Sequence, residues 1–216
     1  ILLGLVGSEM CIRDSLLVDE ENSRMKVLLK GQQSDKIDLI MRMGEIIEQL
    51  KDEVETNKHD ITIIGGGGNK GIHQKLVQFI DSSVFVVKNY SVSKKYKILL
   101  PVNDSKGSDM AVETAINFAK SYKLNVEIVS VPEGKKSIEE VEKILKKTKE
   151  KFSKNRIKTT TKLIDGPTVN SIVNYAKDDS IVILGVSPKN PIMKYFFGSK
   201  PLSIAQKCNC PVLITK

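Results

Sequence analysis

The 216-residue chain contains no tryptophan, 5% aromatic residues, two histidines and three cysteines. With so few aromatic side chains, surfaces on which nucleobases could stack are scarce, and the net charge of +8 is interpreted as solvated helix faces. We therefore expect no nucleic-acid partner. His59 and His73 have no cysteine nearby and match no metal-ligand spacing or catalytic triad, so the sequence predicts neither a metal site nor catalytic residues.

The cysteines and the apolar runs exclude further classes of protein. Cys11, Cys208 and Cys210 are too few for a disulfide framework, and Cys208 and Cys210 lack the two-residue spacer of a redox or zinc pair. No apolar run approaches the roughly 20 residues that a membrane span needs. The sequence also lacks the basic start and long apolar core of a secretory signal. We expect a cytoplasmic protein with no membrane segment in this chain.

Two segments, residues 59–89 and 179–216, follow the same plan. Each contains an apolar strand ending in glycine, a loop rich in turn residues, a second glycine that opens a helix, and a last apolar strand. An internal repeat of this kind indicates two copies of one structural unit. The second copy is complete and the first is not.

The second copy alternates strands and helices from residue 96 to the end of the chain. Its apolar patterns predict five strands and four helices, in the order Tyr96–Val102, Ser108–Tyr122, Asn125–Val131, Ser137–Phe152, Lys158–Ile164, Thr168–Lys177, Ile181–Leu184, Ser199–Lys207 and Pro211–Thr215. Strict alternation of this kind predicts an α/β fold with a doubly wound parallel five-stranded sheet and helices on both faces.

The first copy is shorter. Its patterns predict strands at Lys26–Lys30, Ile61–Ile64 and Ser83–Val87 and helices at Gln33–Glu55 and Lys70–Ile80. Residues 1–15 (ILLGLVGSEMCIRDS) lack periodicity and resemble a sequencing adapter read as protein, so we expect them to lie outside the fold. The alternative is that Ile1–Val6 forms a strand. The predicted divisions are residues 1–15, a partial unit at 16–90 and a complete unit at 91–216.

Two stretches carry a family resemblance. Residues 98–119 (ILLPVNDSKGSDMAVETAINFA) and 181–216 resemble the first strand and helix and the last third of the universal stress protein family. The match covers residues 96–216, while residues 26–89 resemble only strands 3, 4 and 5 of an upstream copy. The resemblance implies the strand order 3-2-1-4-5 in the C-terminal unit. It also implies that strands 1 and 2 of the first copy are missing, so we expect either a longer natural protein or a gap filled by Ile1–Val6 and strands of the second copy.

A nucleotide site is also implied by the resemblance. ATP-binding members share the loop G-x2-G-x9-G-[ST], of which this chain keeps Gly185, Gly198 and Ser199 but has Pro188 at the middle glycine. Proline removes a backbone donor and stiffens the loop. The alternative is structural, because a strand-to-helix turn favours glycine and serine is a good N-cap. Lys200 beside the loop favours an anion but equally fits a solvated position.

The other walls of the implied site follow two strands. Pro101, Val102 and Asn103 stand where ATP-binding members have Pro-Val-Asp, so the shape is kept and the charge is lost, while Asp104 adds a carboxylate nearby. The backbone of Ser130 and Val131 matches the position that holds adenine in the family. The expected ligand is ATP or AMP, with Mg²⁺ only as a companion of ATP. The resemblance implies a binding protein with at most slow, incidental ATP hydrolysis.

The four glycines Gly65–Gly68 look like a phosphate cradle but are interpreted as a turn. Gly65 and Gly71 are 6 positions apart whereas Gly185 and Gly198 are 13 apart, and Ile72 stands where the capping serine would be.

Three functions remain open: a nucleotide-responsive regulatory protein, a nucleotide-free tandem protein acting through protein contacts, and a cytoplasmic regulatory tail of a transporter. We also expect Val84–Val87 and Pro211–Thr215 to pair, either within the tandem chain or in a homodimer.

Overall fold

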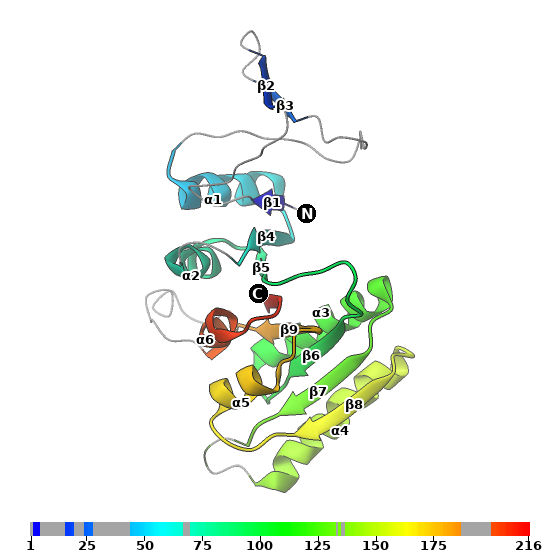
Figure 1. The fold of residues 1–216 in the computed structure, drawn as a ribbon. Helices are drawn as coiled ribbons and strands as arrows, with labels where there is room; N and C mark the ends of the chain where they lie inside the picture. Colours follow the sequence, from blue (N-terminus) through cyan, green and yellow to red (C-terminus); the bar gives the residue numbers. More distant parts are fainter. Residues whose placement is uncertain are drawn as a thin grey trace.

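The computed structural model describes short strands at residues 2–4, 16–19 and 24–27 and then residues 44–66, 70–132, 134, 137–186 and 200–216. Most strands form one eight-stranded sheet in the order β1-β4-β5-β10-β9-β6-β7-β8 (Figure 1). In chain order, its strands are β1 (Leu2–Gly4), β4 (Ile61–Gly65), β5 (Ser83–Val87), β6 (Lys97–Pro101), β7 (Val126–Ser130), β8 (Thr159–Leu163), β9 (Ser180–Gly185) and β10 (Val212–Thr215).

The C-terminal unit, residues 96–216, has the predicted topology. Its five strands lie in the order β8-β7-β6-β9-β10, which is 3-2-1-4-5 in order of appearance within the unit. All neighbouring pairs among them are parallel. The prediction of a doubly wound α/β unit is confirmed, and the sheet continues beyond it into the preceding segment.

Helices cover both faces of this unit (Figure 1). The helices α3 (Lys106–Tyr122) and α4 (Ile138–Lys154) pack on one face, around a core that includes Phe152 and Leu213. The helices α5 (Thr168–Tyr175) and α6 (Lys200–Lys207) pack on the other face. The first unit, made of β4, β5, α1 (Ile46–Asn57) and α2 (Lys70–Phe79), adds both of its helices to this second face.

Two helices begin at signals that are visible in the sequence. Ser105 caps α3 by accepting a hydrogen bond from the backbone N–H of Ser108. Ser137 and Glu140 form a reciprocal capping box at the start of α4. The start of α3 matters most for function, because it lies where β6 ends.

The two units are joined by β5 and β10, which pair antiparallel with Val212 opposite Val86 and Ile214 opposite Val84. The two segments that the sequence predicts to pair therefore meet within the chain. Each of the two strands also has a parallel neighbour on its other edge, β4 for β5 and β9 for β10. A homodimer through either strand would have to displace one of these pairings.

The first unit differs from expectation at its start. The predicted strand Lys26–Lys30 overlaps β3 (Arg24–Val27), which pairs antiparallel with β2 (Leu16–Asp19) in a separate two-stranded sheet. The place beside β4 is taken by β1 (Leu2–Gly4), in parallel register, so residues 2–4 join the main sheet instead of lying outside the fold, as the alternative for Ile1–Val6 expects. In the strand order that the resemblance implies, two strands separate strands 3 and 4, so strand 3 is not expected beside β4. The predicted helix is described as α1, and residues 33–43 of its range lie outside the described residues.

A polar cluster connects the end of α5 to the amino-terminal ends of β6 and β7. The hydroxyl of Tyr175, the last residue of α5, donates to Glu127 Oε1 at 2.5 Å, and Lys97 Nζ donates to Glu127 Oε2 at 2.9 Å. Burial by itself raises the pKa of Glu127, but the hydrogen bonds from Tyr175 and Lys97 outweigh it and hold the pKa below the ordinary 4.5. Burial and the Glu127 carboxylate raise the pKa of Tyr175 to about 12.

Replacing this carboxylate should change how stability depends on pH. Because the folded pKa of Glu127 is lowered, its contribution is present above the unfolded pKa and is lost as pH falls through the folded value. We expect Glu127→Gln to lower the free energy of unfolding by about 1 kcal/mol at pH 7 and by less in acid. Urea unfolding at several pH values measures this difference. Glu113→Gln, at an exposed position of α3, is the control, and a pH-independent difference between Glu127→Gln and the unmodified chain would contradict the assignment.

Candidate functional site

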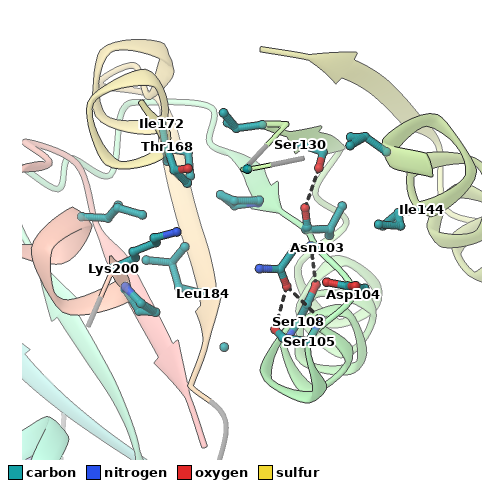
Figure 2. Close-up of a pocket in the computed structure, with 18 residues that line it drawn as sticks. Asn103, Asp104, Ser105, Ser108, Ser130, Ile144, Thr168, Ile172, Leu184 and Lys200 are labelled. Atoms are coloured by element: carbon teal, nitrogen blue, oxygen red, sulfur yellow. Dashed lines mark hydrogen bonds between the residues drawn. The ribbon is translucent and has the colours of Figure 1, made fainter. Parts of the chain in front are cut away.

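A cavity of about 410 Å³ lies at the carboxyl ends of β6, β7 and β9 (Figure 2). The starts of α3, α4, α5 and α6 form further walls. In a doubly wound sheet this is the usual place for a ligand, and the volume falls within the ordinary range of roughly 300–1,000 Å³. The lining residues that carry the argument below are Val102, Asn103, Asp104, Ser105, Ser108, Ser130, Val131, Thr168, Ile172, Leu184, Gly185, Lys200 and Ile204.

Asn103 is held by the cap of α3. Its Oδ1 accepts from the backbone N–H of Ser105 at 3.0 Å and from the Ser105 hydroxyl at 2.6 Å. The backbone N–H of Asn103 in turn donates to Ser108 Oγ at 3.1 Å. Because a backbone N–H can only donate, the side-chain oxygen is fixed toward Ser105, and the amide nitrogen faces the cavity (Figure 2). The site therefore offers a neutral hydrogen-bond donor at the position where ATP-binding members of the family that the sequence resembles have a carboxylate.

The end of β7 is tied to the end of β6. The Ser130 hydroxyl donates to the carbonyl oxygen of Val102 at 2.7 Å, and both residues are buried. The hydroxyl is therefore occupied inside the fold. Val131, the next residue, is only partly buried and lines the cavity.

Gly185 ends β9 directly against α3. A Cβ added at Gly185 would lie 1.6 Å from the carbonyl oxygen of Gly107, in the first turn of α3. Such a distance is impossible without moving backbone, so the close approach of β9 and α3 requires glycine at this position. The end of β9 and the start of α3, which meet at this glycine, both form walls of the cavity.

Charge is distributed unevenly around the cavity. Figure 2 shows Lys200 on the α6 side, across the cavity from Asn103 and Asp104 on the α3 side. The buried side chains of Ile172, Leu184 and Ile204 provide an apolar surface. Among the described lining residues, the apolar wall and the Lys200 cation on one side suit a flat, partly apolar ligand with an anionic group, while the Asp104 carboxylate lies on the opposite side.

The structure brings together most of the residues predicted from the sequence. Those lining the cavity are Pro101, Val102, Asn103, Ser130, Val131, Gly185 and Lys200. The other three, Pro188, Gly198 and Ser199, lie outside the described residues.

Other lining residues were not anticipated. The N-cap pattern of Ser105 and the helix start after Pro167 could have indicated Ser105, Ser108 and Thr168. The apolar wall carries no such signal, because in sequence Ile172, Leu184 and Ile204 resemble any other core residues. Across the described residues, no group of three histidine, cysteine, aspartate or glutamate side chains is placed to hold a metal ion. In the same part of the chain, no helix has the length and apolar character needed to cross a membrane.

Comparison with known proteins assigns the C-terminal unit to a family. The model of the universal stress protein family matches residues 96–216, which are the whole C-terminal unit. The chain belongs to the universal stress protein family. It is 28% identical over 138 residues to a universal stress protein of Methanocaldococcus jannaschii, covering 56% of this chain and 81% of that protein.

Solved structures of universal stress proteins share the fold over most of the chain. A universal stress protein from Archaeoglobus fulgidus superposes with a TM-score of 0.63 at 17% identity, covering 79% of this chain and 64% of that one. A putative universal stress protein from Pseudomonas aeruginosa gives a TM-score of 0.60 at 13% identity, covering 80% of this chain and 69% of that one. At these identities the likeness is one of fold. This chain spans about two thirds of the length of each structure.

Proposed function

We propose that this universal stress protein binds an adenine nucleotide, ATP or AMP, in the cavity of its C-terminal unit and acts as a regulatory binding module. The observation that carries the proposal is the cavity at the carboxyl ends of β6, β7 and β9, where the Asn103 amide and Lys200 face an apolar wall. The cytoplasm, where ATP and AMP are abundant, is the compartment that this function requires.

The lining residues fit the parts of a nucleotide. A purine is flat and largely apolar, which suits the surface formed by Ile172, Leu184 and Ile204. A phosphate carries negative charge, which suits Lys200 at the first turn of α6, where helix N–H groups also favour an anion. On the α3 side, Asn103 adds a neutral donor, and the Asp104 carboxylate beside it suits a ribose hydroxyl better than a phosphate.

The proposal does not include catalysis. Neither histidine is a lining residue of the cavity: His59 Nε2 contacts Glu53 Oε1 at 3.0 Å, and His73 Nε2 lies 3.1 Å from the carbonyl oxygen of Gly65. Both histidines therefore have structural partners in the first unit. Any hydrolysis of ATP would be slow and incidental to binding.

Charge reversal at Lys200 tests the nucleotide site. We expect the unmodified chain to bind AMP saturably and Lys200→Glu to weaken the binding about tenfold or more, because a phosphate then meets a carboxylate in place of a cation. Isothermal titration calorimetry with AMP and with ATP measures both affinities.

Lys75→Glu supplies the control for this test. Lys75 is exposed in the middle of α2, which contributes no lining residue, so the same change in net charge should leave AMP affinity within about twofold. Equal losses in both variants would point to net charge alone. No saturable binding to the unmodified chain at millimolar AMP or ATP would overturn the proposal.

The absence of saturable AMP or ATP binding would favour a second function, a nucleotide-free protein that acts through protein contacts. The observation in its favour is the pair of departures from the ATP-binding pattern, Pro188 in the loop and Asn103 at the end of β6. The two functions are thus separated by the same titration.

A further inference from the structure

Each unit contributes one lysine whose side chain contacts a helix of the other unit, next to the paired strands β5 and β10. Lys88 follows β5, and its Nζ donates to three carbonyl oxygens at the end of α6: Ala205 at 2.7 Å, Gln206 at 3.1 Å and Cys208 at 3.1 Å. Lys216 follows β10, and its Nζ donates to the carbonyl oxygens of Leu76 and Ile80 at the end of α2. Each unit therefore supplies the lysine that caps the last helix of the other.

The antiparallel pairing of β5 with β10 explains the exchange. Val86 stands opposite Val212, so the end of β5 lies beside the start of β10 and close to where α6 ends. The last carbonyl groups of a helix have no partner within it, and a cation is favoured there by the helix dipole. The lysine that follows each strand therefore reaches the carbonyl groups at the end of a helix in the opposite unit.

The helix that Lys88 holds is the one that forms a wall of the cavity. Lys200, Pro201 and Ile204 of α6 line it. The carbonyl oxygen of Ile204 accepts from the backbone N–H of Cys208 at 2.8 Å, and the nearest acceptor of Lys88 is the adjacent residue, Ala205. Lys88 therefore fixes the turn of α6 that carries Ile204 into the cavity wall. The helix held by Lys216, α2, contributes no lining residue.

One of the glycines in the run after β4 makes room for this lysine. A Cβ added at Gly66 would lie 1.9 Å from Lys88 Cγ, and the backbone N–H of Gly66 donates to the carbonyl oxygen of Val87 at 2.7 Å. Gly66 thus packs against the stem of Lys88. By contrast, a Cβ at Gly65 would meet nothing within 4 Å.

We infer that Lys88 is a positioning residue for the nucleotide site, so that the site in the C-terminal unit depends on a side chain from the first unit. This inference rests on the proposed function. Lys88 acts through α6: it sets where the helix lies, and through it the cavity wall formed by Lys200 and Ile204. Lys216 makes the equivalent contact at α2, away from the cavity, and so offers a matched comparison within the same chain.

The test compares Lys88→Met with Lys216→Met in the full chain, using AMP as the probe. Both variants keep most of the apolar stem and remove the cation. We expect Lys88→Met to weaken AMP binding about three- to tenfold and Lys216→Met to leave it within about twofold, although both lower the melting temperature. Lys88→Arg, which keeps a charged donor, should recover most of the affinity. Equal affinities for the two methionine variants, or no recovery with arginine, would overturn the inference.

Hydrogen exchange gives a readout that does not depend on a ligand. Backbone amides of residues 202–208 should exchange faster in Lys88→Met than in Lys216→Met, and those of α2 should show the reverse. If the unmodified chain binds no AMP, the proposed function fails, while this exchange pattern still decides whether Lys88 positions α6. Unchanged protection of residues 202–208 in Lys88→Met would overturn the positioning role.

Gly66→Ala is an independent way to displace the same lysine without removing its charge. Because the added methyl overlaps the Lys88 stem, we expect a loss of AMP affinity in the same direction as for Lys88→Met. Gly65→Ala, whose methyl meets no neighbour, is the control. Unaltered affinity and unaltered exchange of α6 in Gly66→Ala would count against the positioning role.

Discussion

Gly185→Ala should lower the free energy of unfolding by about 2–3 kcal/mol, more than a methyl group added at an ordinary surface position. The new Cβ would fall 1.6 Å from the carbonyl oxygen of Gly107 and 2.3 Å from its carbonyl carbon. Both atoms belong to backbone, so no side-chain rotation relieves the overlap, and either β9 or α3 must move. Since both form walls of the cavity, AMP affinity should fall together with stability. Urea unfolding and calorimetry on the same sample measure the two effects.

The internal repeat supplies the matched control. Gly65 ends β4 as Gly185 ends β9, but an added Cβ there meets nothing within 4 Å. Gly65→Ala should therefore change the free energy of unfolding by less than about 0.5 kcal/mol. If the two variants lose equal stability, steric overlap with Gly107 is not the cause, and the explanation given for Gly185 is wrong.

Leu213→Ala should destabilise the chain by about 2–5 kcal/mol, the usual range for removing a buried leucine side chain. Leu213 is fully buried at the centre of β10, opposite Phe85 of β5 and beside Ile183 of β9. The cavity left behind would lie where the two units meet, so both should lose stability. Chemical unfolding followed by hydrogen exchange measures the loss and shows whether protection falls in β4 and β5 as well as in β6–β10.

Leu163→Ala is the control for Leu213→Ala. Leu163 ends the edge strand β8 and is only partly buried, so less than half of the loss at Leu213 is expected. Loss of protection confined to the C-terminal unit in Leu213→Ala would show that the two units unfold separately, contrary to this expectation.

The architecture of the C-terminal unit was predictable because each of its elements follows a strong local pattern. Alternating apolar runs and capping signals such as Ser137 and Glu140 are read from short windows of sequence. The first unit is different. The alternative in which Ile1–Val6 forms a strand that fills the gap agrees with β1 beside β4. Nothing local indicates that β3 pairs with β2, because strand pairing depends on which partners the rest of the chain leaves free.

The candidate site was predictable in part, for a related reason. Residues that end strands, such as Pro101 and Gly185, fall at the carboxyl edge of a doubly wound sheet once the strand order is known. The contacts of Lys88 and Lys216 with the opposite unit were not predictable. In sequence, a lysine after a strand looks like a solvated residue, and only the antiparallel pairing of β5 with β10 brings Lys88 to α6. The sequence does not distinguish Gly65 from Gly66, although the structure has room for an added methyl group at Gly65 and not at Gly66.

The antiparallel joint between β5 and β10 also sets the polarity of the whole sheet. Because β4 and β5 run against β10 and β9, the chain leaves β4 at Gly65 on the opposite rim from the one where it leaves β9 at Gly185. The cavity thus opens on one rim, and the glycine run begins on the other. The two strand ends that the internal repeat makes equivalent in sequence, Gly65 and Gly185, therefore cannot line one common pocket.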